Sequence, residues 1–481
     1  MNGIGIDIGT TTVSFLALEA ETGRVLESRT VLNDTWIRTE NPLEKIQDPD
    51  RITKIVQEQL SVMLRQYQPA GIGISCQMHG FLYTDREGRA RSPFYTWQDG
   101  RGRESARILS RQLHVPVSEG YGLATHLFLL EKGLVPENAA QMVTIGDYVG
   151  QRLCKEAAGP VSAGNAASWG GFDAARGRFR REELEGCGID PSVLPEIAGD
   201  FQCIGVLEGH IPVAAAIGDN QASFLGSVPD GTRTVLVNVG TGSQVSVGMP
   251  GMAGNGIPGK KEAETAGTER ETERETETET AESPEIEFRP CLNTLTLCVG
   301  SALCGGRAYA LLEEFFREVL KMADAPERCV ENLYEKMAAS MEGLDSGKAP
   351  VLNPAFSGSR SDPFLRASIR GLTPENFTPG YLTYGMLEGV AEELNTLYRQ
   401  MPLKGLKPVY LAGAGNGIRK NPVLQRILEE KFRMPLQIPV HREEAAYGAA
   451  LYGLCAAGVL KDIREGQNKI RFQDASEKKP R

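Results

Sequence analysis

The chain has 481 residues, which is too long for a single hydrophobic core, so we expect two or three domains. The sequence contains no run of about eighteen apolar residues, which argues against a membrane span. It has no concentrated basic patch and a net charge of −10, and the missing patch argues against a nucleic-acid partner. The nine cysteines form no C-x-x-C pair and the five histidines are widely spaced, so we expect reduced thiols in a cytoplasmic protein and no zinc framework.

The chain begins with a predicted β-hairpin. Apolar residues alternate with small or polar ones over residues 4–8 and again over residues 13–17, which is the period of half-buried strands. Asp7 precedes the turn, where a magnesium ion would meet the oxygens of a bound anion. A threonine-rich hairpin without a ligand is the alternative for these residues alone. The turn offers backbone N–H groups and hydroxyls that can surround an anion, and it consists of Gly9, Thr10, Thr11 and Thr12.

A first polar cluster follows a predicted strand–helix–strand segment. A third strand is predicted at 25–31, an amphipathic helix at 51–67 and a buried strand at 70–75. The last strand ends in Gln77, Met78 and His79, at the edge where α/β units usually bind ligands. A satisfied core histidine is the alternative interpretation of His79.

Two further clusters lie in the first half. Trp97, Asp99 and Arg101 combine an indole, a carboxylate and a guanidinium, which together can bind several hydroxyls of a polyol. The alternative is a capped loop in which Asp99 pairs with Arg101. A third polar-aromatic cluster contains Asn165 and Trp169, and loop packing is its alternative interpretation.

A candidate general base lies at a strand–helix junction. A buried strand predicted at 212–217 leads into the sequence G-D-N-Q at 218–221 and then into a helix. The dipole at the helix N-terminus would keep the Asp219 carboxylate ionised. Such a carboxylate is suited to accepting the proton of a hydroxyl. An ordinary Asp N-cap is the alternative.

The opening hairpin is repeated half a protein later. Residues 235–243 restate residues 4–12 at an offset of 231 positions without a gap, with Asn238 in the place of Asp7. This repetition indicates a duplicated domain, and two such turns facing one cleft would hold a polyphosphate from two sides. Neither copy is a Walker loop, because no G-K-[ST] follows. The second turn consists of Gly240, Thr241, Gly242 and Ser243, with Ser243 aligned to Thr12.

The rest of the chain carries an insertion and a second series of elements. Residues 252–285 are acidic and almost free of apolar side chains, so we expect a disordered excursion from a hairpin. A charged tail after residue 461 is expected to fray. The other predicted elements are strands at 286–290, 294–299, 409–412 and 436–438 and helices at 308–322, 384–398, 421–432 and 443–453. Leu311, Leu312, Phe315 and Leu320 are available for the buried side of the first of these helices.

Together these motifs resemble the FGGY family of carbohydrate kinases, within the actin-like ATPase superfamily. The resemblance rests on D-x-G-T-T at 7–11, G-D-N-Q at 218–221, G-T-G-S at 240–243 and the glycine-rich loop that starts at Gly413. Within the family, the segments at 77–80, 96–101, 122–125 and 165–170 are most similar to sedoheptulokinases.

The resemblance implies an α/β fold of two actin-like (ribonuclease H-like) domains, each with a five-stranded sheet, around a central ATP and sugar cleft. The expected divisions are a sugar-binding domain at 1–228, a nucleotide-binding domain at 229–465 and a charged tail at 466–481. The substrate would be a small ketose, with sedoheptulose expected and xylulose or ribulose as alternatives. An actin-like ATPase without a sugar acceptor is the alternative of another class. No nucleic-acid or membrane partner is expected, and the protein would be a monomer or homodimer.

The resemblance also implies roles for individual residues. Asp219 would be the general base, and Asp7 would hold Mg²⁺ at the phosphates of ATP. The implied sugar-binding residues are Gln77, Met78, His79, Trp97, Asp99, Arg101, Asn165, Trp169 and Asn220. The implied nucleotide-binding residues are those of both turns together with Gly305, Gly413, Ala414, Gly415 and Asn416.

Overall fold

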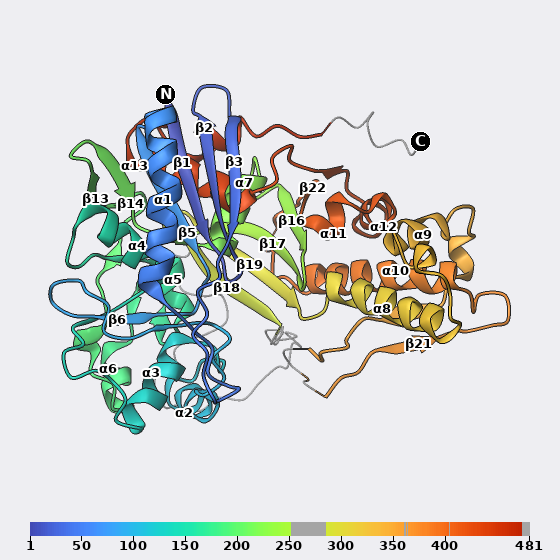
Figure 1. Cartoon of the computed structure of the whole chain (residues 1–481), viewed down its shortest axis with the longest axis horizontal. Coiled ribbons are helices and arrows are strands. Elements are labelled where there is room, and N and C mark those ends of the chain that lie inside the picture. The colour runs from blue at the N-terminus through green and yellow to red at the C-terminus, as the bar shows by residue number, and fades with distance from the viewer. Residues whose placement is uncertain (252–284, 360–361, 363, 404, 474–481) are drawn as a thin grey trace, which may run out of the picture.

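The computed structural model describes residues 1–251, 285–359, 362, 364–403 and 405–473. Nearly all of the predicted acidic insertion, residues 252–284, lies outside the described residues. Two large sheets flanked by helices form the framework of the described chain, one in the first half and one in the second, together with five two-stranded sheets (Figure 1). No helix within these ranges has both the length and the apolar character needed to cross a bilayer.

The first sheet is built around the opening hairpin. Its order is β13-β14-β5-β1-β2-β3, with β15 also paired to β5. The first strand is antiparallel to the second and parallel to β5. The strands are β1 (Asn2–Ile8), β2 (Thr12–Glu19), β3 (Arg24–Leu32), β5 (Gly71–Cys76), β13 (Cys203–Leu207), β14 (Ile211–Ala214) and β15 (Ile217–Gly218).

The second sheet repeats this arrangement, which confirms the predicted duplication. Its order is β18-β19-β17-β16-β22-β23, and the hairpin strand β16 is antiparallel to β17 and parallel to β22. The described sheets have seven and six strands, so the implied five strands in each was an underestimate. The strands are β16 (Thr234–Val239), β17 (Ser243–Pro250), β18 (Ile286–Leu292), β19 (Leu295–Ala302), β22 (Tyr410–Ala414) and β23 (Leu436–Gln437).

The two hairpins differ by one residue in the turn. Ile8 pairs with Val13 in the first hairpin, whereas Val239 pairs with Ser243 in the second. Ser243 therefore occupies the ladder position of Val13, not the position of Thr12 to which the ungapped sequence repeat assigns it. The second turn is thus the tighter of the two.

Helices cover both sheets. Figure 1 shows α1 along the first sheet and α8 beside α10 in the second half, where these two helices are in contact. Helices near the sheets are α1 (Pro49–Tyr67), α4 (Ile145–Cys154), α7 (Asp219–Ser227), α8 (Gly306–Met322), α10 (Pro379–Arg399), α12 (Pro422–Phe432) and α13 (Glu444–Ala456). The other described α-helices are α2 (Arg103–Leu113), α3 (Gly122–Glu131), α5 (Ala163–Ser168), α6 (Arg181–Gly186), α9 (Leu333–Ala339), α11 (Asn416–Arg419) and α14 (Ile463–Gln467).

The predicted strands and helices are present, except that the strand expected at 212–217 is divided into β14 and β15. Two further expectations, on a buried side chain and on the tail, are corrected. Phe315 is 54 % exposed, and Phe316 packs against the core in its place. The expectation of a frayed tail is wrong as far as Gln473, because this segment contains α14 and then bridges back from Phe472 to Pro439. Lys469 also donates from Nζ to the carbonyl of Ala20 at 2.8 Å.

Helix α13 crosses from the second half to the first sheet. It packs against β1, β5 and α7, so its position does not follow the predicted division at residues 228/229. Glycines permit the close approach: a Cβ on Gly5 or Gly73 would lie 1.8 Å from the carbonyl oxygen of Ala446 or Ala449, respectively. The helix therefore joins the two halves through direct backbone contact.

We expect Gly73→Ala to destabilise the protein by about 3 kcal/mol or more, because its methyl group cannot fit without moving α13 away from β5. The measurement is the free energy of unfolding in urea. The matched control is Gly186→Ala at the exposed end of α6, where a Cβ meets no atom within 4 Å. A Gly73→Ala protein as stable as this control would contradict the close packing.

Candidate active site

The first turn is held in shape by Asn33. Gly9 donates its backbone N–H to Thr12 O at 3.0 Å, which closes the turn. Asn33 donates from Nδ2 to Gly9 O and from its backbone N–H to Thr11 O, each at 2.8 Å. The turn itself is half-buried to exposed, so a ligand can reach it.

A ring of hydrogen bonds links this turn to two of the predicted sugar-binding residues. Trp97 donates from Nε1 to Thr10 Oγ1 at 3.0 Å, and this hydroxyl donates to Gln77 Oε1 at 3.0 Å. Gln77 Nε2 donates to Gln47 Oε1, and Gln47 Nε2 donates back to Thr10 O, each at 2.9 Å. Sequence reasoning missed Gln47, because a buried amide in a strand of two residues, β4 (Ile46–Gln47), carries no pattern of its own.

His79 lies beside this ring in an unusual backbone conformation. Its φ is +72°, in the left-handed region. Its backbone N–H donates to Ser168 Oγ at 3.0 Å, and its Nδ1 lies 2.7 Å from Ser168 O. Because a carbonyl oxygen only accepts, Nδ1 carries the proton. The imidazole stacks on Tyr121, with ring centroids 4.5 Å apart.

Met78, Asn165 and Trp169 lie beneath His79. Met78 is buried against Gly218, the residue before Asp219. Asn165 donates from Nδ2 to Ala216 O at 3.0 Å. Trp169 is 0 % exposed, and its Nε1 donates to the carbonyl of Gly80 at 3.0 Å. The Trp169 ring therefore supports the site from below, as in the loop-packing interpretation, and does not face a substrate.

Asp99 and Arg101 form a buried ion pair. Arg101 donates from Nε to Asp99 Oδ1 at 3.0 Å and from Nη2 to Asp99 Oδ2 at 2.7 Å, and its Nη1 donates to Glu44. Asp99 is 0 % exposed. The paired-loop interpretation is therefore the one that the structure supports, and the expected direct contact of Asp99 and Arg101 with sugar is not. The pair holds the loop from which the half-exposed Trp97 reaches Thr10.

Two carboxylates meet at the ends of strands in the first sheet. Asp7 accepts from Ser75 Oγ at 2.7 Å. Asp219 is the first residue of α7 after the N-cap Gly218, so the Asp N-cap interpretation is wrong; Asp219 Oδ1 accepts from the N–H of Asn220 at 2.7 Å. Burial, and then the charge of Asp219, raise the pKa of Asp7 to about 7. Burial also raises the pKa of Asp219.

A third carboxylate reaches Asp7 from the far end of the chain. Glu443, immediately before α13, accepts from Thr30 Oγ1 at 3.0 Å and contributes to raising the pKa of Asp7. No spacing in the sequence relates Glu443 to Asp7, because only the packing of α13 on the first sheet brings them together. Within the described ranges, no group of three His, Cys, Asp or Glu side chains is arranged to enclose a metal ion.

The second turn is held by the start of α8. Gly240 N–H donates to Gly242 O at 3.0 Å. Gly306 N–H donates to Gly240 O at 2.8 Å, and Arg307 N–H donates to Thr241 O at 3.0 Å. A Cβ on Gly305 would lie 2.6 Å from Ser243 Cβ, so the position requires glycine. The Ser243 hydroxyl is buried and has no hydrogen-bond partner among the described residues.

The loop that begins at Gly413 lies beside the second turn. Ala414 pairs with Asn238 in the ladder between β22 and β16. Gly415 has a φ of +82°, and a Cβ on it would lie 2.6 Å from Asn238 Oδ1, so glycine is required on both grounds. Asn416 then begins α11. The structure thus brings together the predicted nucleotide-binding residues of the second half.

The beginning of α7 contacts both halves. Asn220 donates from Nδ2 to Gln244 Oε1 on β17 at 2.9 Å, and Gln221 donates from Nε2 to Pro290 O on β18 at 3.0 Å. Asp219 therefore lies at the junction between the first sheet and the second. The Asn220 amide therefore contacts the second half. Its contact with the sugar stays a prediction.

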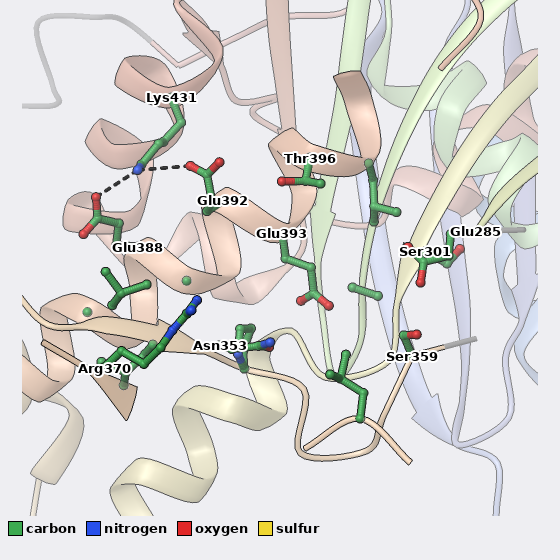
Figure 2. Close-up of a pocket in the computed structure, with 18 residues that line it drawn as sticks. Glu285, Ser301, Asn353, Ser359, Arg370, Glu388, Glu392, Glu393, Thr396 and Lys431 are labelled. Atoms are coloured by element: carbon green, nitrogen blue, oxygen red, sulfur yellow. Dashed lines mark ion pairs between the residues drawn. The ribbon is translucent and has the colours of Figure 1, made fainter. Parts of the chain in front are cut away.

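A cavity of about 510 Å³ lies in the second half, between α10, β19 and the strand β20 (Val351–Asn353). Figure 2 shows Lys431 in its wall, paired with Glu388 at 2.9 Å and Glu392 at 3.1 Å. None of the predicted site residues lines this cavity. Its lining residue Ala302 pairs with Ser243, however, so the cavity adjoins the second turn.

Known proteins match along nearly the whole chain. A sedoheptulokinase from Mus musculus is 29 % identical over 93 % of this chain and 96 % of its own length, and a xylulose kinase from Staphylococcus xylosus is 24 % identical over 93 % and 89 %. The structure of a ligand-bound xylulose kinase from Lactobacillus acidophilus superposes with a TM-score of 0.78 at 18 % identity, covering 98 % of this chain and 92 % of that one. A Plasmodium falciparum glycerol kinase with ADP gives a TM-score of 0.73 at 17 % identity, covering 97 % and 92 %.

The family assignment follows from the domains. Residues 3–226 match the N-terminal domain of the FGGY family of carbohydrate kinases, and residues 276–457 match its C-terminal domain. The two-sheet arrangement agrees with the actin-like fold of the solved kinases, as the sequence motifs predicted. The chain belongs to the FGGY family of carbohydrate kinases and is a sugar phosphotransferase.

Proposed function

We propose that the protein transfers the γ-phosphoryl group of ATP to the terminal hydroxyl of a ketose, with sedoheptulose as the first candidate. One observation carries the proposal: Asp219, at the junction of the two halves, lies in electrostatic range of Asp7, the residue that precedes the first glycine–threonine turn. Phosphoryl transfer depends on positioning and on offsetting charge, and this arrangement offers both.

Asp219 is the proposed general base. Its carboxylate starts a helix, and burial raises its pKa above the ordinary value of a carboxyl group, which makes it a stronger proton acceptor. Its immediate neighbour Asn220 reaches β17, so the position of the base depends on contact between the halves. In this role, Asp219 takes the proton of the attacking sugar hydroxyl.

Asp7 is the proposed residue for Mg²⁺, which would neutralise charge on the phosphates. Magnesium in such sites is held by one or two carboxylates together with water and substrate phosphates, so a cage of three protein ligands is not required. Asp7 fits this role because its half-buried carboxylate lies in electrostatic range of a second like charge, Asp219. Among the described residues, Ser75 is the side chain that donates to it. A cation there would offset that repulsion.

The second turn, Gly305 and the Gly413 loop form the proposed ATP site. Glycines at 305 and 415 let these two segments pack directly against Ser243 and Asn238, so that both lie close to the second turn. The first turn would hold the same phosphates from the opposite side. The buried Ser243 hydroxyl supports this proposal, since it is a donor that a phosphate oxygen could satisfy.

The proposed sugar site is the space around His79, Tyr121 and Trp97. The likeness to the Mus musculus sedoheptulokinase favours sedoheptulose, and the xylulose kinases keep xylulose and ribulose as alternatives. An ATPase without a sugar acceptor is disfavoured, because ATP hydrolysis alone would not require the hydrogen bond from Trp97 to Thr10. The nine free thiols fit the cytoplasmic location expected from the sequence.

The substrate is tested by ADP release from the purified protein with sedoheptulose, xylulose, ribulose and glycerol side by side. We expect the highest kcat/KM for sedoheptulose. Asp219→Asn should lower kcat by about 10³-fold or more while the protein remains folded. ADP release at an undiminished rate without any sugar would contradict the kinase proposal, and substantial sugar-dependent turnover by Asp219→Asn would contradict the choice of base.

The pH dependence of stability tests the charge at Asp7. Its pKa is raised from 3.8 to about 7, so the folded state binds this proton more tightly than the unfolded state. The contribution of Asp7 to the free energy of unfolding therefore falls as pH rises between these two values. In thermal melts without metal, Asp7→Asn should reduce the loss of Tm as pH rises from 3.8 to about 7, the window set by those two pKa values.

Asp147 and Glu393 also have pKa values raised to about 7 by burial, so part of the slope should remain in Asp7→Asn. Addition of Mg²⁺ at the alkaline end should raise the Tm of the parent protein more than that of Asp7→Asn. Equal slopes and equal responses to Mg²⁺ in the two proteins would contradict the proposed site.

A further inference from the structure

Strand β18 brings an arginine to the edge of the proposed sugar site. Arg289 is only 8 % exposed. The carbonyl of the next residue, Pro290, accepts from Gln221 in the first turn of α7 at 3.0 Å. The same carbonyl lies 2.7 Å from where a Cβ on Gly164 in α5 would be. Thus β18 belongs to the second sheet but is docked against two elements of the first half.

Arg289 is oriented by a neighbour on its own strand. Its Nε and Nη2 donate to one oxygen of Glu287, at 3.0 and 2.7 Å, and both residues lie on the same face of β18. Within the described part of the chain, these are the hydrogen bonds that the guanidinium makes. Nη1 therefore remains as a donor for another partner.

The guanidinium faces two groups of the first half. It lies in electrostatic range of Asp219 and of Tyr121, the ring stacked on His79. Its positive charge opposes the effect of burial on the pKa of Asp219. No hydrogen bond within the described residues joins Arg289 to Asp219, so the two side chains interact through their charges and not by a direct bond.

We propose that Arg289 is a substrate-binding residue of the kinase, whose Nη1 donates to an oxygen of the ketose between Asp219 and Tyr121. The inference rests on the proposed function and adds a contact from the second half to the sugar. Arginine has donors and no acceptor, so its partner must be a sugar hydroxyl or carbonyl oxygen acting as an acceptor. Asp219 complements it, since a carboxylate accepts from the hydroxyl that is to be phosphorylated.

A purely structural role explains the arrangement less well. A buried ion pair adds little stability, because desolvation of both charges offsets their attraction. The pair with Glu287 also needs only one side of the guanidinium. Because β18 leads this charge to the first residues of α7, sugar binding and contact between the halves would be linked through Arg289.

The experiment uses the full chain with Arg289→Met and Arg289→Lys. Sugar and ATP KM values, kcat, and direct binding of sedoheptulose by calorimetry without ATP are measured. We expect Arg289→Met to raise the KM for sugar, and its dissociation constant, about tenfold, while the KM for ATP stays within about twofold. Arg289→Lys keeps the charge but loses the fork, so it should recover part of this loss.

The matched control is Arg317→Met, which removes an arginine paired with Glu313 on α8, away from the site. It should leave both KM values unchanged. If Arg289→Met does not fold, Arg289→Lys alone still tests the contact, since unchanged sugar KM and binding in that folded variant would overturn it. A lowered kcat with unchanged sugar KM and binding would mean that Arg289 acts only through Asp219, which also overturns the contact.

Failure of the proposed function is recognised separately. It would appear in the parent protein, as an absence of both sugar-dependent ADP release and sugar binding, and it would overturn both proposals. Failure of the Arg289 proposal alone would appear only in the variants, against an active parent protein that binds the sugar.

Discussion

The repulsion between two half-buried carboxylates, Asp7 and Asp219, is the interaction on which the rest of the site depends. Asp7 and Asp219 are brought together at the ends of strands in one sheet, and burial raises the pKa of both. Ionised groups removed from water are costly unless other groups compensate them. Ser75 donates to one carboxylate and the N–H of Asn220 to the other, while Arg289 supplies positive charge from the second half.

This compensation makes the site a property of both halves. Helix α13 carries Glu443 to the first sheet, and β18 carries Arg289 to α7. The close contacts of Gly5 and Gly73 with α13 show how small residues permit the crossing. The duplicated hairpin contributes a second turn, but with Asn238 in place of the carboxylate. The first hairpin therefore has a carboxylate that the second lacks, although the backbone arrangement is repeated.

Much of the fold could be predicted because its signals are local. The alternating residues of β1 and β16 predict strands, and the apolar face of α1 predicts a helix, from residues a few positions apart. The repeat at an offset of 231 positions also predicted the duplication. Its one error, the place of Ser243, arose because an ungapped alignment cannot register a turn that is one residue shorter.

The site was predicted less completely, since its polar groups meet through packing. The sequence left open whether Asp99 and Arg101 bind sugar or one another, and burial of the pair decided this. Gln47, Glu443 and Arg289 could not be found, because nothing near them in the sequence indicates which distant strand end they approach. Similarly, Trp169 has the chemistry of a sugar-binding residue, but it is buried and its Nε1 donates to the backbone at Gly80.

The sequence by itself determined the two glycine–threonine hairpins, the strand–helix order and the family. These follow from side-chain periodicity and backbone requirements that act over a few residues. Only the tertiary structure decided which charges share one site. The pKa of Asp7 depends on Asp219 and Glu443, which come from α7 and from the residue before α13. Such convergence depends on how helices pack across the sheets, and it cannot be predicted from the local periodicity of the sequence.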